Sequence, residues 1–181
     1  MLKTDFRKNA EIEEAKAEWA DLSGMLQGHA EYEEEKLHSL LEKKGATVHL
    51  LAHDQHEEMD AAFPEIDSLF SAAIREEDQD RKVEIGYQLY LTFRKFVGNN
   101  LLHLHEEETK ILPELQRLYS DEELRLVEDS TYQILTPQEM IDMLRVLFPH
   151  MNALDKEAFL KDIEISQPHK FKEILPTVLQ L

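Results

Sequence analysis

Ionisable side chains interrupt an apolar helical stripe in the middle of the chain. From Phe93 to Leu115, apolar residues recur at spacings of three and four, which is the repeat of one face of an α-helix. Asn100, His103 and Glu107 fall on that same face. An ionisable group that faces a core is costly unless it has a partner or a metal. The stripe therefore predicts that His103 and Glu107 point inward, one turn apart. A solvated acidic face is the alternative that this segment alone leaves open.

The same pattern occurs a second time, 74 residues earlier (103 − 29). At that offset His29 corresponds to His103, and Glu33 corresponds to Glu107. The earlier pair also lies on an apolar stripe at helical spacing, which contains Trp19, Leu22, Leu26, Leu37 and Leu41. Internal self-similarity carries more weight than a single motif. The repeat predicts two antiparallel or pseudo-symmetric helices that present the same His-x3-Glu turn to one centre.

The composition favours an all-α fold. The 181 residues include only 5 glycines and 6 prolines, and the sequence shows no strand-like alternation. Few helix breakers and many Glu, Leu, Ala and Lys residues are typical of helical domains. We expect a single domain over residues 1–181, with an up-down helical bundle over 9–116 and a C-terminal cap of shorter helices over 117–181. Capping-box sequences that begin at Ser120 and Thr136 predict the starts of two of these shorter helices.

The charge balance and the absence of cysteine exclude several classes of partner and site. There are 38 acidic and 20 basic residues, which gives a net charge of −18. Nucleic-acid backbones and anionic membrane surfaces would be repelled, so we expect neither as a partner. With no cysteine, the chain has no disulfide, iron–sulfur cluster or zinc–thiolate site, and it fits a reducing cytosol. The sequence also lacks an apolar span and a signal peptide, so we expect a cytoplasmic protein.

Position on an apolar stripe separates candidate ligands from histidines of the surface. An acid follows four residues after six of the histidines, namely His29, His38, His53, His56, His103 and His169. His29 and His103 share a stripe with their acids, and His56 lies on the stripe of the helix between them. We interpret His38 and His169 as members of surface pairs. His53 is a further candidate ligand, because it lies one turn from His56 on the same face.

Imidazole and carboxylate groups on buried stripes suggest a transition metal. Together they suit iron, and also manganese or zinc. Facing helices of a bundle can bridge two ions with such groups, and a site short of protein ligands leaves room for oxygen, peroxide or nitric oxide. The ferritin-like scheme uses Glu-x-x-His on two helices, and the one useful match here, Glu35 to His38, lies off the stripe. The ferritin-like scheme is therefore disfavoured.

The motifs together resemble those of the hemerythrin-like, or HHE cation-binding, family. The resemblance covers residues 20–116 and rests on His29-x3-Glu33-Glu34, on Gln55-His56-Glu57, and on His103-x3-Glu107-Glu108 followed by Leu112-Pro113. It implies a four-helix bundle around a non-haem di-iron centre that carboxylates bridge. It also implies a set of ligands: His29, Glu33, His56, His103 and Glu107. Among these, Glu33 and Glu107 would be the bridges.

The chain departs from the family at its beginning. Members usually supply a further histidine from an additional N-terminal helix, whereas no histidine precedes His29 here. Another part must then supply the fourth wall of the bundle. The candidates are the helix after Ser120, with Glu128, or a partner chain, which makes a homodimer one expected arrangement. The alternative is an incomplete site that binds metal weakly or holds a single ion.

Three functions remain open on the sequence alone. The first is a hemerythrin-like protein whose iron site binds or senses oxygen or nitric oxide, or handles iron. The second is a metal-free helical protein with a degenerate site, which acts in regulation or interaction. The third is a di-iron enzyme that removes peroxide. The sequence does not decide whether the protein is an enzyme.

Overall fold

A computed structural model describes residues 3–180, without the side chains of residues 128 and 130, and every regular element in that range is a helix. The expected all-α class is therefore confirmed for the described residues. None of the helices in this range combines the length and the apolar character that crossing a bilayer requires. The chain divides into two compact units, Met1–Leu118 and Tyr119–Leu181. The expectation of a single domain stays a prediction.

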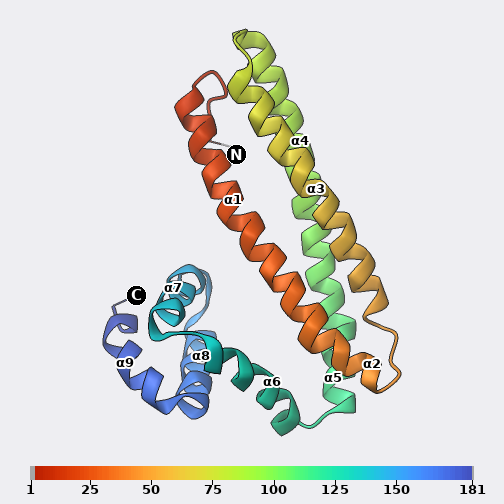
Figure 1. Cartoon of the computed structure of the whole chain (residues 1–181), viewed down its shortest axis with the longest axis vertical. Coiled ribbons are helices and arrows are strands. Elements are labelled where there is room, and N and C mark those ends of the chain that lie inside the picture. The colour runs from red at the N-terminus through yellow and green to blue at the C-terminus, as the bar shows by residue number, and fades with distance from the viewer. Residues whose placement is uncertain (1–2, 181) are drawn as a thin grey trace. The chain divides into compact units, whose positions relative to one another are not determined.

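Three long helices dominate the described part of the first unit: α1 (Asn9–Tyr32), α3 (Leu50–Arg75) and α4 (Gln79–Glu106). Each runs opposite to the long helix before it in the chain (Figure 1). The middle helix, α3, packs against both α1 and α4. Consequently α1 and α4 run in the same direction, so the two copies of the repeat are parallel and not antiparallel.

Aromatic side chains hold the three long helices together. The Trp19 ring of α1 contacts the rings of Phe63, Phe93 and Phe96, with centroid distances of 5.7, 5.8 and 5.3 Å. The indole nitrogen of Trp19 donates a hydrogen bond of 3.0 Å to Asp67 Oδ1. Fully burying an apolar side chain of this size contributes roughly 1.5–3 kcal/mol. These contacts therefore hold α1, α3 and α4 together. The candidate ligands lie further along the same helices or in the turns that follow them.

Both copies of the repeat end in a π-helical turn. The first turn, Glu33–His38, leads into α2 (Ser39–Lys43), and the second, Glu107–Ile111, leads into α5 (Leu112–Leu118). Each begins at the glutamate of its His-x3-Glu motif. A π turn adds a residue to the α-helical repeat and occurs often at functional sites. Pro113 is the second residue of α5.

The first π turn overturns the interpretation of His38 as a surface residue. The extra residue sets the side chains that follow it back by about 100° around the helix, relative to an uninterrupted α-helix. His38 lies at the end of this turn and points inward, with only 4% of its surface exposed, whereas Leu112, its counterpart in the second copy, is 47% exposed. Its proposed partner Glu42 lies on the outside and contacts His49 instead, with 3.4 Å between Glu42 Oε1 and His49 Nε2.

The second unit has a core of its own. It contains α6 (Asp121–Ile134), α7 (Pro137–Leu147), a 3-10 turn (Phe148–His150), α8 (Ala153–Ser166) and α9 (Pro168–Val178). Capping boxes at Ser120 and Thr136 start α6 and α7, as the sequence predicted. Its buried residues are Tyr132, Met140, Leu144, Phe148, Ile163, Ile174 and Val178. The side chain of Glu128, a sequence candidate for the fourth wall, lies outside the described residues.

Candidate metal centre

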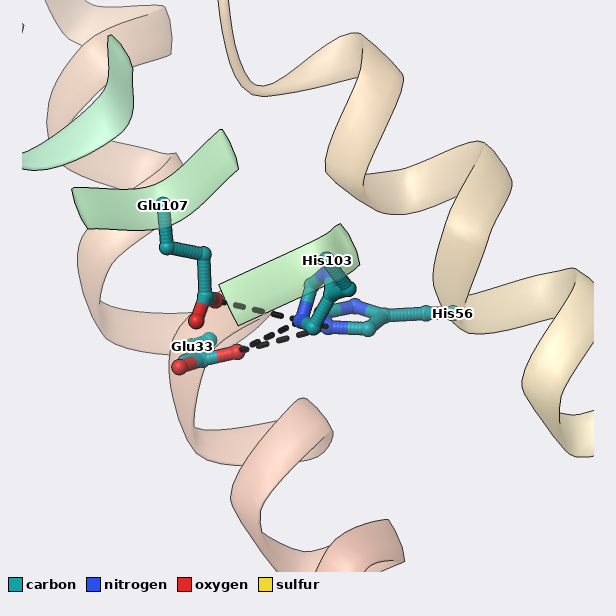
Figure 2. Close-up of side chains that lie close together, drawn as sticks. All are labelled: Glu33, His56, His103 and Glu107. Atoms are coloured by element: carbon teal, nitrogen blue, oxygen red, sulfur yellow. Dashed lines mark hydrogen bonds and ion pairs between the residues drawn. The ribbon is translucent and has the colours of Figure 1, made fainter. Parts of the chain in front are cut away.

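Four ionisable side chains of the first unit meet where α1 and α4 pass into their π turns. Glu33, His56, His103 and Glu107 each offer one ligand atom, and these atoms all lie within 4.8 Å of one another. Figure 2 shows the two carboxylates side by side, facing the two imidazoles. Glu33, His56 and His103 are buried, and Glu107 is half-buried. The cluster thus joins both copies of the repeat to α3.

The two histidines face each other through the same ring atom. His56 Nε2 and His103 Nε2 are 3.1 Å apart. Glu107 Oε1 lies 3.2 Å from His103 Nε2, and Glu33 Oε2 lies 3.3 Å from His56 Nε2. Two imidazole nitrogens that share one ion at about 2.1 Å are themselves about 3–3.4 Å apart. The spacing of the two rings therefore fits a shared metal ion.

Hydrogen bonds on the far side of each ring direct the Nε2 atoms into the cluster. His56 Nδ1 lies 3.1 Å from Glu34 Oε1, and His103 Nδ1 lies 3.1 Å from Gln55 Oε1. A carboxylate and an amide oxygen accept hydrogen bonds, so each Nδ1 donates. Metal-binding histidines almost always donate their other ring N–H in this way, which fixes the tautomer and the ring orientation.

One carboxylate oxygen inside the cluster has no hydrogen bond. Glu33 Oε2 is buried and receives none from either neighbouring ring, although it lies between His56 and His103. A buried acceptor without a partner costs about 1–3 kcal/mol. A cation beside Glu33 Oε2 would remove this cost, so the oxygen gives a second, independent indication that the residues fit a metal ion.

Without an ion, a proton on His103 balances the carboxylates. Burial lowers the pKa of His103, but Glu107 and Glu33 outweigh burial and raise it to about 9. For the Glu33 carboxyl, burial alone raises the pKa, whereas the imidazoles of His103, His29 and His56 bring it well below its usual range. In the metal-free cluster, a His103 imidazolium therefore balances the ionised Glu33 carboxylate, and a metal cation can replace that positive charge.

The remaining two residues expected from the sequence lie outside the cluster. His29 Nε2 is 2.9 Å from Glu33 Oε1, but the His29 side chain is 52% exposed. His53 Nδ1 is 3.0 Å from Glu34 Oε1, and its side chain is 46% exposed. Of the six candidate ligands, the structure brings together Glu33, His56, His103 and Glu107. His29 contacts the cluster through Glu33, and His53 contacts Glu34, which is outside the cluster.

Sequence reasoning missed four residues that surround the cluster. Glu34 and Gln55 belong to the motif segments, but no role was assigned to them, although each is next to a candidate ligand. The His38 ring stacks on His56, with 5.8 Å between centroids and 16° between planes. His49 follows, 5.6 Å from His38, and both of its ring nitrogens are buried without a hydrogen bond. His38 lies at the end of the π turn Glu33–His38, and the residue types of this segment do not signal that turn.

A small cavity adjoins the cluster. Its volume is about 150 Å³, and it is lined by His29, His56 and His103 together with the apolar side chains of Leu26, Met59 and Phe63. A water molecule occupies about 30 Å³ in the liquid. A diatomic molecule therefore fits beside the Nε2 atoms, in surroundings that are mostly apolar.

Comparison with known proteins adds no family assignment. No family model matches the sequence, and no curated protein and no solved structure matches it either. Any functional assignment therefore rests on the geometry of the cluster and on the resemblance of the motifs.

Proposed function

We propose that the protein is a hemerythrin-like metal-binding protein that holds non-haem iron at Glu33, His56, His103 and Glu107. The observation that carries this proposal is the orientation of the two imidazoles. Both Nε2 atoms face the same carboxylates, while Glu34 and Gln55 hold both Nδ1 atoms. Two imidazoles and two carboxylates suit iron, with manganese and zinc as alternatives.

The contacts of Glu33 support a site for two ions. Its Oε1 lies 2.9 Å from His29 Nε2, while its Oε2 points between His56 and His103. One carboxylate thus faces imidazoles through both of its oxygens. A second ion would be held on the His29 side of Glu33, where Glu33 and the half-exposed His29 would be its ligands. His53 is not needed in this arrangement.

The chain's own residues would bind the metal, release one proton from His103 and limit the access of water to the site. Bound iron supplies redox chemistry and an open position for a small molecule such as oxygen or nitric oxide. His103 loses the Nε2 proton that it carries in the metal-free protein, because a metal ligand must be deprotonated. Leu26, Met59 and Phe63 line the adjoining cavity and keep its surface apolar. This environment suits binding, sensing or carrying of a diatomic molecule.

Iron content tests the proposal directly. Full-length protein is loaded with ferrous iron without oxygen, desalted and analysed by mass spectrometry. We expect about two ions per chain, as in two-metal bundle sites. His103→Ala should lose most of this iron, and His169→Ala, an exposed residue of the second unit, should lose none. Wild-type protein without iron, or two variants with equal iron, would contradict the proposal.

A metal-free regulatory or interaction protein is the second candidate. The specific observation that favours it is the internal balance of charge, since the His103 imidazolium already compensates Glu33 and Glu107. The iron measurement separates the two candidates. A peroxide-removing enzyme would bind the same iron and also turn over peroxide, so a peroxidase assay on the loaded protein distinguishes that third candidate.

The proposal includes an up-down bundle as the fold that carries the site. Three of its helices are α1, α3 and α4, which alternate in direction (Figure 1). Among the described residues of the first unit, no fourth long helix accompanies them.

A further inference from the structure

Two cavities of the first unit reach the metal cluster through different side chains. The cavity described above is lined by His56 and His103, and we call it the imidazole cavity. A second cavity, with a volume of about 210 Å³, is lined by Glu33 and Glu107, and we call it the carboxylate cavity. Neither carboxylate of the cluster lines the first cavity, and neither imidazole of the cluster lines the second. This separation agrees with Figure 2, in which the carboxylates lie on one side and the imidazoles on the other.

The two π turns form most of the wall of the carboxylate cavity. Besides the carboxylates of the cluster, it is lined by His38 from the first turn, by Glu108 from the second, and by four aliphatic side chains that include Leu112. Glu108 is exposed and Leu112 is 47% exposed, so the cavity reaches the surface. Among the described residues, no lysine or arginine lines it. A cation that enters here therefore meets carboxylates without a lysine or arginine to repel it.

One buried side chain in the wall of this cavity has a ligand atom without a hydrogen bond. Glu33 Oε2 is buried and accepts none, and the Glu33 side chain is only 7% exposed. The Glu107 side chain is 17% exposed, and Glu108, the next residue, is exposed. Three carboxylates of increasing exposure thus line the cavity between the unpaired oxygen and the surface. Because a buried acceptor without a donor is costly, the unpaired oxygen indicates that this series of acids leads to a cation site.

The charge of a carboxylate acts on an ion before the two are in contact. A dication is attracted to a carboxylate over several ångströms, whereas a neutral imidazole binds it only at contact, through the lone pair of a ring nitrogen. An ion in transit also gives up water, and carboxylate oxygens can replace that water as ligands of a divalent ion. An ion should therefore meet the carboxylates of the cluster first and the imidazoles last.

We propose that a divalent metal ion reaches the cluster through the carboxylate cavity, and that Glu108 is the first residue to bind it. This inference rests on the metal site proposed above. Glu108 passes the ion to its neighbour Glu107, after which Glu33 Oε2 and the two imidazoles complete the binding. The carboxylate of Glu108 binds the ion only in transit, because it is not one of the four groups whose ligand atoms lie within 4.8 Å of one another.

The imidazole cavity is less suited to the passage of an ion. Among the described residues, Asp60 is the one carboxylate in its wall, and Asp60 is exposed. Leu26, Met59 and Phe63 contribute apolar surface, which cannot replace the water that an ion gives up. This side of the cluster suits an uncharged molecule. Asp60 provides a matched control, since it is an exposed acid in the wall of the other cavity.

A residue that binds the ion only in transit changes the rates of binding and not the affinity. Uptake and release follow the same path in opposite directions, so the loss of Glu108 should slow both by the same factor. One carboxylate in contact with a dication in water changes a rate by about tenfold. A ligand of the bound ion would behave differently, because its loss weakens binding and speeds up release.

Cobalt(II) is the probe, because it binds nitrogen and oxygen sites more tightly than ferrous iron does and absorbs visible light. Uptake by the metal-free, full-length chain is followed by stopped-flow absorbance, release is followed in excess EDTA, and affinity is measured by competition with a second chelator. We expect Glu108→Gln to slow uptake and release by about tenfold each and to leave the affinity within about threefold. Asp60→Asn removes the same charge and should leave both rates within about twofold. Glu108→Asp, which keeps the charge, should take up cobalt within about threefold of the wild-type rate.

The outcomes separate this inference from the metal site itself. A wild-type chain that binds no cobalt overturns both. A wild-type chain that binds cobalt, with the same rates in Glu108→Gln and Asp60→Asn, overturns the entry route and leaves the metal site in place. Slower uptake in Asp60→Asn alone would place the entrance at the imidazole cavity and overturn the route as well. A Glu108→Gln variant with weaker binding and faster release would make Glu108 a ligand of the bound ion, which also contradicts the inference.

Discussion

The two His-x3-Glu turns have the same spacing and the same π-helical turn at the glutamate, yet they contribute to the centre in different ways. In the turn of α4, the His103 side chain is 3% exposed and the Glu107 side chain 17%. In the turn of α1, the His29 side chain is 52% exposed and the Glu33 side chain 7%. One turn buries its imidazole most deeply, and the other buries its carboxylate.

Helix α3 accounts for this difference. Its His56 and Gln55 contact His103 on both ring nitrogens, which closes that side of the cluster. No equivalent pair from α3 reaches His29, whose only ion pair among the described residues is with Glu33. The motif thus sets which residues stack one turn apart. The helix that packs against the motif determines which of them reaches the interior.

The largest difference between the two turns should appear when each histidine is removed. His103→Ala leaves the buried Glu33 and the half-buried Glu107 without their cation, which should cost the metal-free protein about 3–5 kcal/mol of unfolding free energy. His29→Ala removes a half-exposed contact and should cost less than about 1 kcal/mol. Urea unfolding with a chelator present measures both. Equal losses of unfolding free energy would show that the two turns do not differ in how they stabilise the metal-free protein.

The pH dependence of the stability of the metal-free protein should arise mainly from His103, in the His-x3-Glu turn of α4. The pKa of His103 is raised to about 9 by Glu107 and Glu33 against the effect of burial. Its contribution to stability is therefore complete below the unfolded pKa of about 6.5 and disappears as the pH rises through about 9. The loss of unfolding free energy over this pH range should be on the order of 3 kcal/mol.

Urea unfolding between pH 6 and pH 10 tests this expectation. The pKa of His29 is also raised, mainly by Glu33, but solvent screens this half-exposed pair and its part should be small. His103→Gln should flatten the profile, and His29→Gln should leave most of the slope. A wild-type profile that is flat between pH 6.5 and pH 9 would contradict the protonation of His103.

The carboxylates that follow the two motifs offer a finer comparison. At the offset of 74, Glu34 corresponds to Glu108 (34 + 74). Glu34 accepts from His56 Nδ1, whereas Glu108 is exposed. Loss of a group that orients a metal ligand typically lowers metal affinity by about 10–100-fold. Glu34→Ala should show this loss in competition with a chromogenic chelator, and Glu108→Ala should bind iron as wild type does. If Glu108→Ala lowered the iron affinity more than Glu34→Ala did, Glu34 would not be the group that orients His56.

The periodicity of apolar residues predicted α1, α3 and α4 because a regular helix fixes the direction of each side chain once its phase is known. The same periodicity put His56, His103, Glu33 and Glu107 on inward faces. It gave the wrong side for His38 and no role for Glu34, and both residues lie in the π turn Glu33–His38, where the regular α-helical repeat does not hold. It could not predict the exposure of His29, since a stripe on one helix does not show how completely its neighbours cover it.

The smallest expected effect concerns His38, whose counterpart in the second copy is Leu112 (38 + 74). Burial, followed by the charges of His56 and His49, lowers the pKa of His38 to about 4, and nearby Glu33 and Glu34 oppose this shift. A histidine whose pKa is lowered on folding stabilises the protein fully above its unfolded pKa of about 6.5. This contribution is lost as the pH falls toward about 4.

Leucine is the residue of the other copy at this position. Replacing His38 by leucine should therefore separate the effect of losing a polar side chain from the effect of losing a buried group that titrates. No hydrogen bond among the described residues involves the His38 ring, so His38→Leu leaves no polar partner buried alone, and at pH 7 stability should change by less than about 1 kcal/mol. Between pH 6.5 and pH 4.5, the variant should lose less stability than wild type. His29→Leu is the control, because a histidine whose pKa is raised adds no slope in that window. If the stabilities of His38→Leu and wild type fall in parallel, the buried imidazole is not neutral.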